Sequence, residues 1–353
     1  MGPYYAMFPV NFADDVVTRY TAVGDAVLDP FAGRCTAVFS AASRGRSGLG
    51  VEINPVGWIY GKTKLGAAAE SDVNDRLMQI GRHAGMYDSE ARHLPLFFRH
   101  CFSASVRRFL VAARRELRWR RCAVDRTAMA FILIYLHGKR DYSLSNQMRQ
   151  TKAMAPAYAV RWWSRAELKP PKVDPVEFLV KRVKWRYAKG RPNLAPSNVY
   201  LGDATKLLSR RPLDVRGSEL LPARLLLTSP PYYKITNYHY DQWLRLWLLG
   251  GRPDAARSGE VNRGKFENLR SYRALLERVL SASARLLTDD AVVYVRTDRR
   301  PETLSATREV LKEVFPQKSY SERARPFKAP TQTRLFGDAT SKVGEVDVVL
   351  LPR

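Results

Sequence analysis

Patterns of metal binding and of disulfide bonding are missing from this sequence. Its three cysteines, Cys35, Cys101 and Cys122, include no Cys-x-x-Cys pair, and none of the five histidines stands at metal-ligand spacing from them. A structural zinc site needs closely spaced Cys and His ligands, and a disulfide scaffold needs more cysteines. We therefore expect reduced thiols, no metal ion and a cytoplasmic location.

Long apolar runs are missing as well. The longest one, Ala128 to Leu136, has about half of the roughly 20 residues that a membrane-spanning helix needs. The first residues, Met1, Gly2 and Pro3, do not begin a signal-peptide pattern. Both features weigh against a membrane as the partner of this chain.

Acidic residues are few relative to basic ones. The chain has 34 Asp and Glu against 59 Lys and Arg, a formal charge of +25 in 353 residues. Residues 91–190 alone hold 23 Lys and Arg against 6 Asp and Glu, a net +17, with several Trp and Tyr among them. Cations pair with phosphates and aromatic rings stack on bases, so this segment predicts a nucleic-acid partner.

Apolar runs of strand length alternate with helical patterns in residues 16–70 and again from residue 198 onward. This alternation is typical of βαβ units, whose parallel strands are buried on both faces. We predict an α/β Rossmann-like fold with a mostly parallel twisted sheet over 1–69 and 196–353. Residues 70–195 carry helical patterns and Pro-rich connectors, which predicts a mainly helical basic insert between the second and third strands.

The first chemical motif is Asp-Pro-Phe-Ala-Gly at 29–33, directly after the first expected strand. A glycine at this point lets a cofactor approach the backbone. The second expected strand ends at Glu52, where an acid can accept hydrogen bonds from both hydroxyls of a ribose. The pair predicts a cofactor that contains a nucleoside.

The second motif is Thr-Ser-Pro-Pro-Tyr at 228–232, after the apolar run Leu225 to Leu227. The exocyclic amine of a nucleobase is a poor nucleophile because its lone pair is delocalised into the ring, so an enzyme must supply hydrogen-bond acceptors for it. A serine hydroxyl and a proline carbonyl can accept, two prolines stiffen the turn, and a tyrosine ring can stack on an extruded base. The predicted catalytic residues are Ser229, Pro230, Pro231 and Tyr232.

Together the two motifs resemble those of the amino-methylating DNA methyltransferases, which make N4-methylcytosine and N6-methyladenine. Phe8-Pro9 before the first strand and Gly202-Asp203 after the third resemble further cofactor elements of this family. The resemblance spans about 1–65 and 198–300. It implies a methyltransferase fold of the Rossmann-like kind, S-adenosylmethionine as cofactor and double-stranded DNA as substrate. The cofactor-binding residues that it implies are Phe8, Pro9, Asp29, Phe31, Gly33, Thr36, Glu52 and Asp203.

Two positions depart from the family pattern. Cys35 stands where the family usually has a second glycine, and Ala37 where it often has a second threonine. The Cys35 side chain is expected to narrow the cofactor pocket.

The serine at position 229 favours cytosine N4 as the target, because adenine enzymes of the family more often have Asp or Asn there. The reaction we expect is direct attack of the base amine on the methyl group, without a covalent enzyme intermediate. Three alternatives stay open: an adenine N6 enzyme, an RNA amino-methyltransferase and a catalytically silent DNA-binding protein of the same fold.

In the family, this motif order places the target-recognition region between the two halves, where the basic insert lies. Within the insert, Asn146, Gln147 and Arg149 have side chains that can make paired hydrogen bonds to a base edge. Lys234 and His239, after the catalytic motif, are further candidates for contact with DNA. A companion restriction endonuclease is a partner that the resemblance suggests.

Overall fold

The chain folds into two compact units. The structure is a computed structural model that describes residues 8–209, 214–215, 218–219, 222–233, 238–255, 268–325 and 344–353. One unit, here the sheet unit, comprises Phe8–Ile53, Leu194–Thr236 and Glu260–Arg353. The other, here the helical unit, comprises Met1–Met7, Asn54–Asn193 and Asn237–Gly259.

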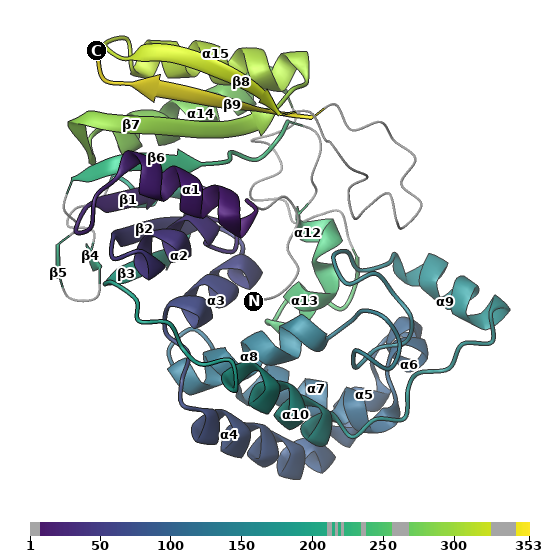
Figure 1. Ribbon diagram of the computed structural model, residues 1–353. Helices are drawn as coiled ribbons and strands as arrows, with labels where there is room; N and C mark the ends of the chain where they lie inside the picture. The colour runs from purple at the N-terminus through teal and green to yellow at the C-terminus, as the bar shows by residue number, and fades with distance from the viewer. Residues whose placement is uncertain are drawn as a thin grey trace. The chain divides into compact units, whose positions relative to one another are not determined.

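The sheet unit is built on a seven-stranded sheet in the order β3-β2-β1-β6-β7-β9-β8 (Figure 1). The first five strands in this row are parallel, and β9 runs antiparallel to β7 and to β8. This order, with one antiparallel strand inserted near the edge, is that of the Rossmann-like methyltransferases, so the predicted fold class is confirmed. The strands are β1 (Ala26–Asp29), β2 (Ser47–Glu52), β3 (Ser197–Leu201), β6 (Ala223–Thr228), β7 (Leu287–Asp298), β8 (Ser319–Arg325) and β9 (Glu345–Leu351).

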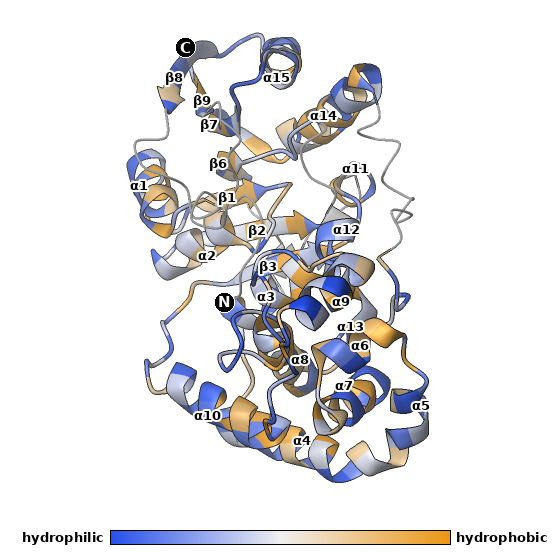
Figure 2. Ribbon diagram, turned by 90° about the vertical axis from the view of Figure 1, so that its right-hand side faces the viewer, coloured by the Kyte–Doolittle hydropathy of each residue, from blue (hydrophilic) through white to orange (hydrophobic). Residues whose placement is uncertain are grey.

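Helices cover both faces of this sheet (Figure 1). Neighbouring residues of a strand point to opposite faces, so Leu226 packs into the core on one side while Leu225 and Leu227 pack into the core on the other. Burial on both faces explains why the central strands consist mostly of hydrophobic residues (Figure 2). One face is covered by α11 (Ala204–Leu207), α14 (Leu269–Ala284) and α15 (Pro301–Val314), and the other by α1 (Val10–Tyr20) and α2 (Thr36–Ser43). A short hairpin, β4 (Asp214–Val215) and β5 (Ser218–Glu219), precedes β6.

Two glycines let α2 approach the sheet closely. A Cβ added at Gly48 would lie 2.8 Å from the Val38 carbonyl oxygen, and one at Gly50 would lie 2.8 Å from the Ala32 Cβ. Real Cβ atoms do not approach this closely, so side chains at these positions would push α2 and the 29–33 motif away from β2. The glycines of β2 therefore set the position of the loop after β1.

The helical unit has a core of its own. The longest apolar run of the sequence forms α8, of which Thr127 to Ile134 are buried. No helix in the described part of the chain is long and apolar enough to cross a membrane. The elements are α3 (Pro55–Leu65), α4 (Glu70–His83), η1 (Ala84–Tyr87), α5 (Asp88–Arg92), α6 (Leu96–Cys101), α7 (Ala104–Glu116), α8 (Ala123–Tyr135), α9 (Pro156–Arg165), α10 (Pro175–Tyr187), α12 (Tyr238–Asp241) and α13 (Trp243–Leu248).

A buried arginine fixes α13 within the helical unit. Arg245 is fully buried, and its guanidinium donates to the carbonyl oxygens of Leu133 at 3.0 Å and Gln150 at 2.7 Å and to the Gln242 side chain at 2.8 Å. A buried cation is tolerated only when its donors are satisfied, as they are here.

The unit boundaries differ from those that we predicted. The helical unit interrupts the sheet unit between β2 and β3, but it begins at Asn54 instead of residue 70 and also takes in 237–259. The reason is that α3 is buried on nearly all sides and packs against α8 and α13. The sequence pattern around residues 55–65 shows an apolar helix but not which core it joins.

Cys35 has an unusual backbone conformation. It precedes α2 with φ 59° and ψ 48°, in the left-handed region that favours glycine, and its side chain is fully buried. A residue with a Cβ is strained there by roughly 1 kcal/mol. Glycine, which the resembled family usually has at this position, would relieve this strain.

We expect Cys35→Gly to be more stable than Cys35→Ala by about 1 kcal/mol, because both lose the thiol and only alanine keeps the strained Cβ. Urea denaturation measures the difference. The matched control is Ala37→Gly, within α2, where glycine should be the less stable residue. A Cys35→Ala variant as stable as Cys35→Gly would show that the backbone there is unstrained.

Candidate functional site

The two motifs meet at one edge of the sheet. β1 and β6 are parallel neighbours, and the chain leaves β1 toward β2 on one side and β6 toward β7 on the other. This reversal of strand order opens a crevice beyond the carboxyl ends of the two strands, where α/β proteins bind ligands. Asp29 ends β1 and Thr228 ends β6, so both motifs begin at this crevice.

Asp29 and Thr228 join the two motifs directly. The Thr228 hydroxyl donates to Asp29 Oδ1 at 2.7 Å, and the backbone N–H of Phe31 donates to the same oxygen at 3.2 Å. Asp29 is 1% exposed and Thr228 is fully buried. Burial raises the pKa of Asp29 to about 7, although both hydrogen bonds oppose the shift.

The other predicted cofactor residues lie along the same edge. Gly33 has φ 54° in the loop after β1, and Phe31 packs against the core from a half-buried position. Thr36 begins α2 and Glu52 ends β2, and both side chains are less than a tenth exposed. Asp203, after β3, accepts hydrogen bonds from the Thr205 backbone and hydroxyl and so caps α11.

Phe8 and Pro9 lie at the start of α1, on the face of the sheet that α1 covers. Phe8 is buried against Phe12, with ring centroids 5.3 Å apart, and Pro9 caps α1 through its carbonyl oxygen. Arg296, near the carboxyl end of β7, lies over the Phe12 ring at 3.5 Å and 6.0 Å from the centre of the Phe8 ring. Arg296 therefore links Phe8 to the edge of the sheet at which the two motifs begin.

The predicted catalytic motif makes a directed chain of hydroxyl groups. Pro230 is buried, while Ser229, Pro231 and Tyr232 are partly exposed. The Ser229 hydroxyl donates toward the Tyr232 hydroxyl at 3.5 Å, and the Tyr232 hydroxyl donates to Glu345 Oε1 at 3.0 Å. Because the Ser229 proton points to Tyr232, the Ser229 oxygen keeps lone pairs for another donor.

Sequence reasoning missed the charged cluster behind Tyr232. Arg296 donates to both oxygens of Asp347, at 2.6 and 3.0 Å, and lies 3.7 Å from Glu345. Tyr294 and Arg325 also donate to Asp347, at 2.8 and 2.7 Å. The available signal was a pair of alternating acids at the start of the otherwise apolar strand 345–351, but its meaning depends on the antiparallel pairing of β9, which places that start beside the end of β7.

The predicted base-reading residues lie in the helical unit, and one of them is wrong. Asn146 is fully buried; its amide donates to the carbonyl oxygens of His100 and Leu168, and its oxygen accepts from the Gln147 N–H. All its polar atoms hold the loop together, so it cannot read a base. Gln147 is partly exposed and accepts from the Arg140 backbone N–H at 2.8 Å, and Arg149 is exposed, so both stay predictions.

Two further DNA contacts were predicted after the Ser-Pro-Pro-Tyr turn, at Lys234 and His239. His239 lies in α12, and Lys234 lies outside the described residues. Both therefore stay predictions.

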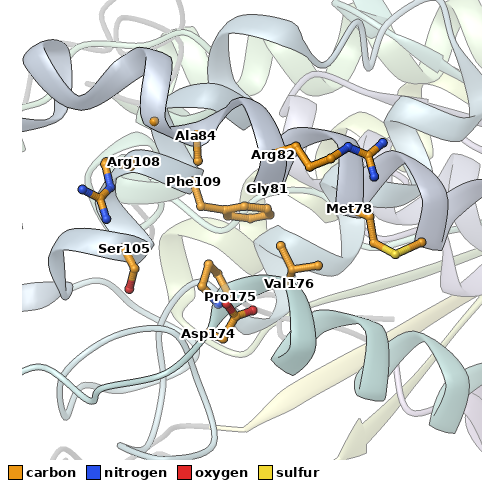
Figure 3. A pocket seen from close by; sticks show the side chains of 11 residues that line it. Met78, Gly81, Arg82, Ala84, Ser105, Arg108, Phe109, Asp174, Pro175 and Val176 are labelled. Carbon is orange, nitrogen blue, oxygen red and sulfur yellow. The ribbon is translucent and has the colours of Figure 1, made fainter.

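A hollow of about 690 Å³ in the helical unit shares no residue with these motifs (Figure 3). Met78, Phe109 and Val176 from α4, α7 and α10 give it an apolar lining, with Arg82 and Arg108 among its other residues. Among the described residues, no group of three or more His, Cys, Asp or Glu side chains can hold a metal ion.

Comparison with known proteins finds no matching family model and no matching curated protein. Among solved structures, the chain is similar to a TehB-like SAM-dependent methyltransferase from Corynebacterium glutamicum at 8% identity, over 97% of this chain and 87% of that chain, with a TM-score of 0.33. It is also similar to the rRNA methyltransferase aviRa from Streptomyces viridochromogenes at 13% identity, over 99% and 88% of the two chains, with a TM-score of 0.36. The strand order of the sheet in itself defines the fold.

The raised pKa of Asp29 predicts a pH-dependent stability. An acid whose folded pKa is about 7, against an ordinary 3.8, binds its proton more tightly in the folded state, so stability falls as pH rises between these values. Between pH 5 and pH 8 the wild type should lose roughly 2–3 kcal/mol of unfolding free energy relative to Asp29→Asn. The asparagine keeps an acceptor oxygen for Thr228 and Phe31.

Urea denaturation at both pH values tests this, with Asp75→Asn on the exposed face of α4 as the matched control. Parallel pH dependences in the wild type and Asp29→Asn would show that Asp29 ionises normally in the folded protein.

Proposed function

We propose that the chain is an S-adenosylmethionine-dependent DNA methyltransferase that acts on the exocyclic N4 of cytosine in double-stranded DNA. The observation that carries the proposal is the Asp29–Thr228 hydrogen bond, which holds a nucleoside-cofactor loop and a Ser-Pro-Pro-Tyr turn at one switch point. A cofactor loop alone fits many reactions, whereas an acceptor-rich, proline-stiffened turn beside it fits methylation of an amine.

The residues at the crevice fit the proposed cofactor. Glu52 ends the strand next to β1, where a carboxylate can accept from ribose hydroxyls, and the loop from Phe31 to Gly33 offers a close backbone approach. Asp203 stands at the end of the next strand, at the position expected to contact the adenine. When bound, S-adenosylmethionine would supply an electrophilic methyl group.

The catalytic turn can orient the amine. The Ser229 hydroxyl, whose proton points to Tyr232, and the Pro230 carbonyl are acceptors for the two amine hydrogens. Holding both hydrogens favours a pyramidal nitrogen, whose lone pair is available for attack. The Tyr232 ring is fixed by its bond to Glu345 and offers a face on which a flipped base can stack.

Expression of the wild type in a host free of DNA methylation, with mass spectrometry of the nucleosides and single-molecule sequencing, tests the function. We expect N4-methylcytosine in one sequence context. N6-methyladenine would correct the base, and methylation of RNA alone would correct the substrate. No modified base at all would overturn the proposal in favour of a silent DNA-binding protein.

In the same assay, Ser229→Ala should slow methylation about 10- to 100-fold, because one hydrogen bond to a group that becomes charged is lost. Cofactor binding, measured by calorimetry, should stay unchanged. An unimpaired Ser229→Ala enzyme would exclude Ser229 from orienting the amine.

The basic helical unit offers a surface that fits DNA. Lys181, Lys184 and Trp185 are exposed along one side of α10, Lys189 is exposed just after its end, and Figure 2 shows hydrophilic stretches on both α9 and α10. Trp185 is 52% exposed, and the Lys189 ammonium lies 4.4 Å from the centre of its ring. An exposed tryptophan among cations supports contact with phosphates and with stacked or sugar groups.

We expect the double variant Lys184→Ala, Lys189→Ala to reduce the slope of log K against log salt by about two, because each lost phosphate contact removes roughly 0.9. Fluorescence anisotropy over a salt series measures it. The matched control is Lys206→Ala, Lys312→Ala in the sheet unit, where Lys312 likewise lies over a ring, that of Tyr320 at 4.9 Å. Equal slopes for the two double variants would show that α10 does not contact DNA.

A further inference from the structure

Methylation of an amine releases a proton that the site must remove. The attacking nitrogen gains a fourth bond and a positive charge, and it becomes neutral again only when one hydrogen leaves as a proton. Asp29 is an acid of the two predicted motifs, but it is buried and already accepts a hydrogen bond from Thr228. The chain of hydroxyls from Ser229 leads elsewhere, to Glu345 on β9.

Both hydrogen bonds of this chain run in the same direction, from Ser229 toward Glu345. Ser229 donates to Tyr232 at 3.5 Å, and Tyr232 donates to Glu345 at 3.0 Å. The order leaves the Ser229 oxygen as the acceptor for the amine and the Glu345 carboxylate as the end of the chain. The Glu345 side chain is 26% exposed, so a proton that reaches it can pass on to water.

The surroundings distinguish Glu345 from the other carboxylate of the strand. Asp347 is fully buried and receives donors from Arg296, Arg325 and Tyr294. Burial by itself would raise the pKa of Asp347, but these partners outweigh it and the pKa lies below its ordinary value. Asp347 therefore stays ionised and neutralises the positive charge of Arg296.

Glu345 is less well paired. The charged and titratable groups that face it are Arg296 at 3.7 Å and Asp298 on β7, Arg325 as its cross-strand neighbour on β8, Asp347 on its own strand, and Tyr232. Burial raises the pKa of Glu345, with Arg296 and the Tyr232 hydroxyl opposing the shift and the two aspartates adding to it. A carboxylate in this state is a stronger base than an exposed one.

We propose that Glu345 is the proton acceptor of the site, reached from Ser229 through the Tyr232 hydroxyl. The inference rests on the proposed function. With S-adenosylmethionine bound, attack of the base nitrogen on its methyl carbon would break the carbon–sulfur bond and leave that electron pair on sulfur. The amine proton then passes to Ser229 Oγ, the Ser229 proton to Tyr232 Oη and the Tyr232 proton to Glu345 Oε1. The result is a neutral methylated amine and a neutral Glu345 carboxyl group, which loses its proton to water.

Single-turnover methylation by Glu345→Gln tests the relay. Glutamine can still accept from Tyr232 but cannot take a proton, so we expect a rate about 100-fold lower. The rate of the wild type should rise with pH as Glu345 ionises, and this limb should be absent in the variant. Tyr232→Phe keeps the ring and breaks the chain, so its loss should be similar, and the double variant should be no slower than either single one.

The matched control is Glu322→Gln on β8, because Glu322 also accepts from a tyrosine hydroxyl, that of Tyr320, and from Arg308, away from the motifs. It should methylate at the wild-type rate. Thermal unfolding and calorimetric cofactor binding confirm that each variant is folded and loaded.

Infrared spectroscopy of the cofactor-free protein gives a second readout that does not need turnover. The wild type should show a carboxyl band whose pH midpoint is raised further in Tyr232→Phe, since a donor to the carboxylate is lost. Asp29, whose pKa is also raised, contributes a carboxyl band in every variant, so the Glu345 band is the part that is lost in Glu345→Gln and kept in Glu322→Gln.

The outcomes separate the two proposals. Methylation by the wild type and by Glu345→Gln at the same rate and with the same pH profile would overturn the relay alone. A wild type that methylates no nucleic acid would overturn the proposed function and the relay with it. Loss of rate in Glu345→Ala but not in Glu345→Gln would show that Glu345 only positions Tyr232, which also overturns the relay.

Discussion

One buried hydrogen bond, from the Thr228 hydroxyl to the Asp29 carboxylate, connects the two halves of the candidate site. The two residues end neighbouring strands and are separated by almost 200 positions in the chain, with the whole helical insert between them. Because both groups are buried, the loss of either partner would leave a polar group without its bond, at a cost of roughly 1–3 kcal/mol. The relative placement of the cofactor loop and the catalytic turn depends on this contact.

The antiparallel strand β9 extends the site beyond its motifs. In a purely parallel sheet, only the last residues of strands would reach the edge at which the two motifs begin. The reversed direction of β9 brings its first residue there instead, so that Glu345 stands next to Asp298 at the end of β7. The neighbouring Asp347 neutralises Arg296, which in turn covers the Phe12 ring. Charge on this edge is therefore arranged by strand direction as much as by residue type.

Local patterns predicted the part of the fold that depends on local interactions. The βαβ unit around β1, α2 and β2, and the strand before the catalytic turn, follow from apolar runs and turn residues that lie close together in sequence. β8 was not predicted, because its residues alternate little and its pairing with β9 supplies what the sequence pattern does not. Asn146 looked like a base-reading side chain, yet its bonds to His100 and Leu168 come from tertiary packing. The role of Glu345 likewise depends on pairing between distant strands.

The division of the chain limits how such proteins can exchange parts during evolution or in the laboratory. From Phe8 onward the chain passes between the two units four times, and the helical unit takes a second segment, 237–259, from the region just after the catalytic turn. The carbonyl acceptors of the buried Arg245 in that segment come from the first one, at Leu133 and Gln150. A chimaera that replaced only residues 54–193 would separate the buried Arg245 from the segment that supplies these acceptors. Recombination therefore has to move both segments together.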